Sequence, residues 1–76
     1  MQSIRLQIWR DVIGTLTNIS EEGPYKILDF GKFKLRLDEV EITALGNQLT
    51  DELIGRRISI IKTDLPDKPM ILREHK

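Results

Sequence analysis

Apolar and polar residues alternate along much of this chain, which is the period-2 pattern of β-strands. The first run extends from Ile4 to Ile19, and two positions interrupt it: Arg10 is a charge at an inward position, and Gly14 replaces an apolar side chain. We interpret residues 4–19 as one long strand in which Gly14 predicts a bulge or sharp coil, so that one strand serves two sides of a barrel. Arg10 predicts a separate break, and the turn at residues 20–24 ends the strand.

The clearest pattern lies between Tyr25 and Leu37, where two strands are joined by Asp29-Phe30-Gly31. A three-residue loop with Gly31 in the left-handed conformation would pair Leu28 with Lys32. One face then carries the apolar residues Tyr25, Ile27, Phe33, Leu35 and Leu37. The other face carries Leu28 and four cations, which we call the cation ribbon: Lys26, Lys32, Lys34 and Arg36. A two-residue closure would mix lysine with leucine on both faces, so the three-residue loop is favoured.

The segment between Asp38 and Gly55 is open to two interpretations. Asp38 is suited to cap a helix with Glu41 at its third position, and Gly46 is suited to end it. The sequence Val-Glu-Ile-Thr inside this segment also suits a strand, so we expect one short helix or a pair of turns. A capped single turn follows at residues 50–55. Leucines recur every four residues and are predicted to enter the core: Leu45, Leu49 and Leu53.

The last third of the chain predicts two more strands. Residues 56–63 are rich in β-branched side chains, with Ile58 and Ile60 on one face, and Arg56-Arg57 is interpreted as an ordinary strand entry. A turn with two prolines precedes a final strand at residues 70–73, and residues 74–76 are expected to be a frayed end.

Five short strands in 76 residues predict a single small β-barrel domain spanning 1–76, because a closed barrel removes exposed edges and surrounds one core. The order of elements resembles the OB-fold, which implies an all-β class, or β with one short helix, as a five-stranded closed barrel. Three segments carry the resemblance: Val12–Leu16, Ile27–Phe33 and Leu53–Ile60. The alternative is an SH3-like barrel, and a helix between the third and fourth strands would favour the OB-fold.

Charge and composition make several classes of function less favoured, among them general nucleic-acid binding, thiolate chemistry and membrane insertion. Twelve basic residues balance twelve acidic ones, which weighs against nucleic-acid binding driven by the field of the whole protein but leaves room for a local basic face. The absence of cysteine removes disulfides and thiolate chemistry and fits a reducing compartment. Apolar runs of three residues or fewer predict no membrane span, and the start Met-Gln-Ser-Ile-Arg lacks the apolar region of a signal peptide. We therefore expect a cytoplasmic protein.

Catalysis has little support in the sequence. The one histidine, His75, is next to the last residue, and no Ser-His-Asp set, glycine-rich phosphate loop or metal-spaced cluster is present. Asp38, Glu39 and Glu41 have the chemistry to hold Mg²⁺, but a solvated acidic turn with a helix cap is the favoured interpretation. We expect no enzyme and no cofactor or metal.

A binding role follows from the hairpin. The OB-fold resemblance implies a ligand face on the outer side of the second and third strands, where the predicted register places the cation ribbon. Single-stranded nucleic acid requires cations along its phosphates and aromatic planes for its bases, and the candidate aromatics are Trp9 and Phe30, with Tyr25 directed inward. The first hypothesis is single-stranded nucleic-acid binding by Lys26, Lys32, Lys34, Arg36, Trp9 and Phe30.

The second hypothesis is a protein-interaction module, such as a small subunit or a homodimer, without nucleic-acid binding. The balanced charge, the acids that follow the basic hairpin and the exposed apolar residues favour it. Aromatic and arginine anchors dominate interface energetics. The candidate interface residues are Trp9, Arg5, Leu28 and Phe30. The alternative to both hypotheses is that the lysines have no ligand and only keep an exposed sheet edge soluble.

Overall fold

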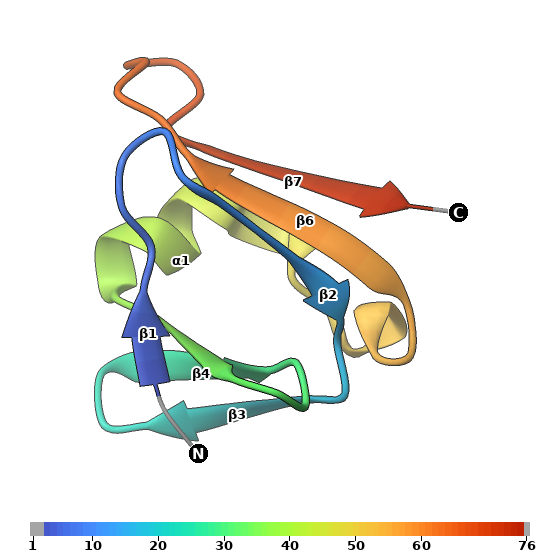
Figure 1. Ribbon diagram of the computed structural model, residues 1–76. Coiled ribbons are helices and arrows are strands. Elements are labelled where there is room, and N and C mark those ends of the chain that lie inside the picture. Colours follow the sequence, from blue (N-terminus) through green and yellow to red (C-terminus); the bar gives the residue numbers. More distant parts are fainter. Residues whose placement is uncertain (1–2, 76) are drawn as a thin grey trace.

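The computed structural model describes residues 3–75, which form two β-sheets, one α-helix and two short 3₁₀ helices (Figure 1). The first sheet has the order β1 (Ser3–Arg5), β5 (Lys34–Leu37), β4 (Tyr25–Asp29), β3 (Asn18–Glu22), and the second has the order β2 (Asp11–Thr15), β6 (Arg57–Lys62), β7 (Met70–His75). The mainly β class with one short helix is confirmed. Neither sheet closes on itself within the described residues, so the closed barrel is not confirmed.

The predicted long first strand is divided into three strands. A turn in which Arg10 N donates to Gln7 O at 3.0 Å separates β1 from β2, which confirms the break near Arg10. β1 does not continue into the second sheet but runs parallel to β5, with Ser3 opposite Lys34. A periodic pattern shows that residues alternate, but it does not show which partner strand each section finds.

The chain passes from one sheet to the other between β2 and β3. Leu16 N donates to Arg56 O at 3.0 Å on the side of the second sheet, and Thr17 N donates to Asp29 O at 2.7 Å on the side of the first. These two residues connect the sheets, but β2 and β3 are separate strands, and the single strand expected to serve two sides of a barrel is not observed. The bulge expected at Gly14 is wrong, because Gly14 pairs regularly with Ile58 in an unbroken ladder.

The predicted register of the hairpin is also wrong. Asp29 pairs with Lys34 and Leu28 with Leu35, so the loop holds four residues, 30–33, rather than three. Gly31 does have the expected left-handed conformation, with φ of +86°. The shift by an odd number of residues moves the second strand's side chains to the opposite face relative to the first. Leu28 and Leu35 consequently face the core together, both fully buried.

The segment after the hairpin forms the predicted helix, α1 (Glu39–Leu45), followed by the 3₁₀ turns η1 (Gly46–Gln48) and η2 (Asp51–Leu53). Asp38 and Glu41 form a capping box, in which Glu41 N donates to Asp38 Oδ1 and Asp38 N donates to Glu41 Oε1, each at 2.9 Å. Gly46 ends the helix. The helical alternative of the sequence interpretation is confirmed.

The core lies between the two sheets and is closed on one side by α1 and the turns after it. Its fully or nearly fully buried residues come from every layer: Leu16, Leu28, Leu35, Leu37, Leu45, Ile58 and Ile60. Leu45 and Leu53 are buried as the leucine spacing predicted, and Leu49 packs against them. The last strand is longer than expected, since β7 extends to His75; Lys76 lies outside the described residues.

Candidate nucleic-acid interface

The outer face of the first sheet carries alternate residues of its strands, as the observed pairing dictates. Because Arg36 is opposite Ile27 and beside Arg5, these three side chains share the outer face. Tyr25 and Asp29 of β4 and Lys34 of β5 belong to the same face by alternation. Glu22 of β3 is opposite Tyr25 and shares this face, which therefore combines three cations, one aromatic ring and two carboxylates. Ile27 is buried beneath them, outside the main core cluster.

Tyr25 is the centre of this face. The guanidinium carbon of Arg36 lies 5.1 Å from the centroid of the Tyr25 ring, and that of Arg5 lies 5.8 Å from it. Both distances are in the range of cation–π contacts. Tyr25 was expected to face the core, and that expectation is wrong because it rested on the incorrect register. The ring instead supports two arginines at the surface.

The two arginines differ in their partners. Arg5 Nη2 donates to Asp38 Oδ2 at 2.9 Å and to Glu41 Oε1 at 3.2 Å. Arg36 forms no ion pair among the described residues, and its Nε is buried without a hydrogen-bond partner there. Because this Nε is itself buried, it cannot contact a ligand, and any anion held by Arg36 would be bound by its terminal guanidinium nitrogens.

Glu41 pairs with one cation of this face, Arg5, and with one cation of the second sheet, Lys62. Its side chain is 2% exposed, and its Oε2 lies 3.2 Å from Lys62 Nζ while Oε1 binds Arg5. The hydrogen bond from Glu41 N–H holds the pKa of Asp38 below its ordinary value, and the Arg5 guanidinium adds to this effect against the opposing effect of burial. Asp38 and Glu41, two of the acids that follow the hairpin, therefore pair with Arg5 and Lys62 rather than with the hairpin cations.

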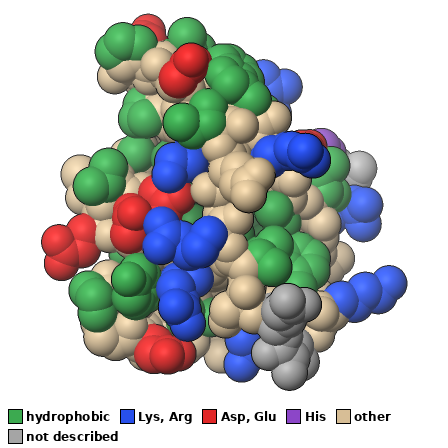
Figure 2. Space-filling model, turned by 60° about the vertical axis from the view of Figure 1, so that its left-hand side comes forward, with side chains coloured by type: hydrophobic (Ala, Val, Ile, Leu, Met, Phe, Trp, Pro, Cys, Tyr) green, Lys and Arg blue, Asp and Glu red, His purple; other side chains and the backbone are tan. Residues whose placement is uncertain are grey.

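The cation ribbon does not lie on one face. Lys26 is opposite Leu37 on the other side of the sheet, and its Nζ is 4.0 Å from Glu21 Oε1. The remaining three occupy alternate positions along β5 and the loop before it, and none forms an ion pair among the described residues. We call these three the cation row: Lys32, Lys34 and Arg36. Figure 2, which brings forward the side of β1 and α1, shows basic side chains in a column with acidic ones beside them.

Phe30 and Leu28 are not surface residues. Phe30 is 7% exposed and stacks on Phe33 with ring centroids 5.1 Å apart, while Leu28 is fully buried. Their predicted exposure is wrong because both side chains point to the core side of β4. Neither can act as a stacking platform or interface anchor at the surface.

Trp9 is exposed, as predicted, but lies apart from the hairpin cations. Its backbone N donates to Lys62 O, and its Nε1 donates to Asp64 Oδ1 at 3.0 Å, which places it beside the end of β6. Its φ of +63° is in the left-handed region, the only such value for a non-glycine residue among the described residues. The structure thus does not bring Trp9 together with the cation row.

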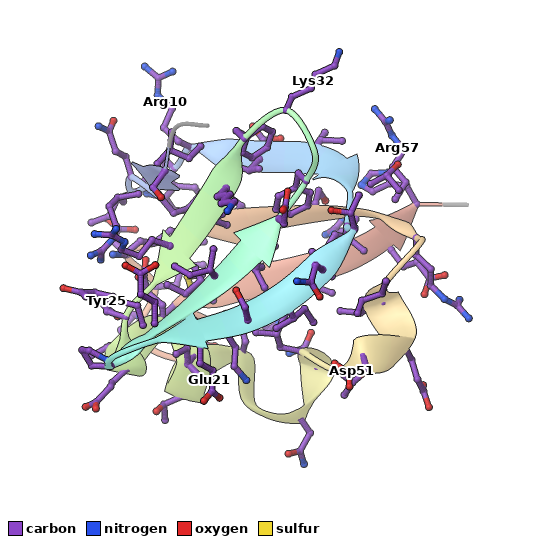
Figure 3. All side chains as sticks on the ribbon, turned by 90° about the horizontal axis from the view of Figure 1, so that it is seen from below. Arg10, Glu21, Tyr25, Lys32, Asp51 and Arg57 are labelled. Carbon is purple, nitrogen blue, oxygen red and sulfur yellow. The ribbon has the colours of Figure 1, made fainter. Side chains whose placement is uncertain are left out.

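Sequence reasoning missed Phe33, Thr15 and Arg57. These residues line a hollow beside the hairpin loop, together with Lys32. Figure 3 shows Lys32 and Arg57 projecting from the same side of the molecule. The pairing of Thr15 with Arg57 is a contact between distant segments, so no local pattern signals it. The unusual pair of phenylalanines around Gly31 was the one available sign of a packed loop.

The structure gives no metal centre to interpret: residues 3–75 contain no group of three or more His, Cys, Asp or Glu side chains placed to hold a metal ion. His75, the sole histidine, lies in β7 with Nε2 at 2.8 Å from Ser59 Oγ. Within the described range, no helix has the length and apolar character needed to cross a membrane. In comparisons with known proteins, no family model, no curated protein and no solved structure matches this chain.

Proposed function

We propose that this chain is a non-enzymatic binding module that holds single-stranded nucleic acid along the outer face of the β4–β5 hairpin. The observation that carries the proposal is the cation row, Lys32, Lys34 and Arg36, which has no ion pairs among residues 3–75. Lys34 and Arg36 are two apart in β5 and so are separated by roughly 7 Å, a spacing that suits successive phosphates, and Lys32 lies in the loop that precedes them.

Arg36 gives the track a second recognition element. Its guanidinium lies against Tyr25 and forms no ion pair among residues 3–75, so its terminal nitrogens can donate to a phosphate. A guanidinium plane also supports a stacked base, and it adds a cation–π contribution. The proposed site consists of Arg36, Lys34, Lys32 and Tyr25, with Arg5 at its border. It does not include three residues expected from the sequence: Lys26, Phe30 and Trp9.

We further infer that the fold is related to the OB-fold, although the sheets are not closed. Three features support this: the β2–β3 segment is shared by both sheets, β4 and β5 form a hairpin, and α1 precedes the antiparallel pair β6–β7. In OB-folds the outer face of the second and third strands binds oligonucleotides. β4 and β5 occupy these positions when β2 and β3 are counted as one strand.

The test is binding of a fluorescein-labelled hexathymidylate, followed by anisotropy at low salt. The variant Lys34→Gln/Arg36→Gln should bind at least about tenfold more weakly, since hydrogen bonds to charged groups contribute about 1.5–3 kcal/mol each. The matched control, Arg10→Gln/Lys68→Gln, also removes two positive charges, both from exposed loop positions. Equal losses in the two variants, or no binding by the wild type, would refute the proposal.

A protein-binding role is the second candidate, and the exposed apolar side chains near Trp9 favour it. Ile8 is 54% exposed, Trp9 53% and Leu65 41%, and the pairing of Ile8 with Lys62 brings the two loops together. An exposed apolar group of this kind is typical of an interaction site. Sedimentation of the wild type and of Ile8→Ser/Trp9→Ser across a concentration series tests self-association. A monomer at every concentration leaves only a different chain as partner.

A further inference from the structure

A hollow of about 350 Å³ lies between the β4–β5 loop and strand β2. Its size is at the lower end of the range for small-ligand sites, roughly 300–1,000 Å³. Ile13, Gly14 and Thr15 form one wall, and the loop residues form the other. The hollow is distinct from the outer face of the hairpin, but it begins where the cation row ends, because Lys32 belongs to both.

The floor of the hollow is aromatic. Phe30 and Phe33 stack with an interplanar angle of 22°, and Phe30 is the buried member of the pair. Phe30 approaches β2 closely: a Cβ added at Gly14 would lie 3.0 Å from Phe30 Cδ1, so a side chain at this position would displace the ring. Phe33 is only partly buried, and it presents aromatic surface toward the hollow.

The rim of the hollow is cationic. Lys32 and Arg57 are both exposed and have no ion pair among residues 3–75. In Figure 3 Lys32 projects from the top of the view and Arg57 from its upper right, with Arg10 at the upper left. The loop that carries Lys32 is held in place, because Gly31 N donates to Asp29 Oδ1 at 2.8 Å and Phe30 N donates to Phe33 O at 3.0 Å.

We propose that this hollow is a nucleobase pocket, in which a base stacks on Phe33 and the adjacent phosphate lies between Lys32 and Arg57. The inference rests on the proposed function, since the base would belong to the strand that follows the cation row. An aromatic floor selects a planar group, and the unpaired cations select an anion. A nucleotide combines both chemistries at a spacing that one pocket can accommodate.

Two ligands separate the role of the base from that of the phosphates: hexathymidylate, and a hexamer of the same charge in which every site is abasic. Affinities are measured for the wild type, Phe33→Leu, Arg57→Gln and the charge-matched control Arg10→Gln. Phe33→Leu retains apolar volume while it removes the aromatic plane, and circular dichroism with thermal unfolding verifies that each variant is folded. Phe33→Leu should weaken hexathymidylate binding about tenfold, as expected for one stacked base.

The same substitution should leave the affinity for the abasic hexamer unchanged. Arg57→Gln should weaken both ligands by more than Arg10→Gln does, because a phosphate contact does not depend on the base. If Phe33→Leu affects both hexamers equally, or neither, the base pocket is refuted and binding along the cation row still stands. If the wild type binds neither hexamer, the proposed function fails first, and the pocket fails with it.

Discussion

At the residue scale, Gly14 is the position where one atom decides the packing of the loop. An alanine Cβ would lie 3.0 Å from Phe30 Cδ1, closer than an ordinary contact. We expect Gly14→Ala to lower the free energy of unfolding by about 1–2 kcal/mol, because the gain from replacing a strand glycine is smaller than the cost of overpacking. Urea unfolding measures this difference.

The destabilisation caused by Gly14→Ala should depend on the ring of Phe30. In the background Phe30→Leu, whose side chain lacks the ring, Gly14→Ala should cost at least about 0.5 kcal/mol less than in the wild type. An equal cost in both backgrounds would show that the penalty arises elsewhere, for example from the backbone of β2.

Single residues also show what the sequence could and could not predict. Gly14 was correctly identified as exceptional, but for the wrong reason: it permits a side chain from another strand to approach, and it does not form a bulge. Tyr25 was assigned to the wrong face. A close approach depends on a residue distant in sequence, so the pattern around the glycine contains no information about it. Arg10, whose effect is local, was interpreted correctly.

At the element scale, the start of α1 links the helix to β1. Asp38 caps the helix and binds Arg5, and the hydrogen bond from Glu41 N–H, followed by Arg5, keeps its pKa below the ordinary value. A carboxylate with a lowered pKa stabilises the fold fully above its unfolded pKa, about 4, and loses this contribution as pH falls through the folded pKa. The variant Asp38→Asn should therefore be less stable than the wild type at pH 7, and the difference should shrink below about pH 4.

The measurement is urea unfolding of both proteins at several pH values between 2 and 7. Asparagine retains the cap, so Asp38→Ala provides the comparison: it should lose a further 0.5–2 kcal/mol or so across the whole pH range. A wild-type advantage over Asp38→Asn that stays constant with pH would contradict the assignment to the charge of Asp38.

The helix α1 could be predicted from the sequence and the hairpin register could not, because the two depend on contacts of different range. The signals for α1, Asp38 with Glu41 and Gly46, are all within nine residues and act through their own backbone. The hairpin contains Ile27 and Leu28 in succession, and both are buried, on opposite faces of the sheet. Two registers are then compatible with the local pattern. The contacts of β4 and β5 with β3 and β1 select one, and these contacts are not visible in the hairpin sequence.

At the scale of the whole molecule, zero net charge conceals a separation of charges. Glu41 lies with Arg5 and Lys62, Glu21 with Lys26, and Glu74 with Arg56. The cation row forms no ion pair within residues 3–75, although Asp29 is opposite Lys34 on the same face. Composition alone excluded a strong general attraction to nucleic acid, and this conclusion does not extend to a short track.

A track of three cations makes a quantitative prediction about salt. For single strands the logarithm of the affinity falls with the logarithm of salt concentration with a slope of about −0.7 for each phosphate contact, so three contacts give about −2. Hexathymidylate binding should then weaken roughly twentyfold between 50 and 200 mM salt. Lys34→Gln should make the slope shallower by about 0.7, whereas Phe33→Leu should weaken binding without changing the slope, because stacking displaces no counterions. A slope near zero in the wild type would mean that the cation row does not contact phosphates, whatever the measured affinity.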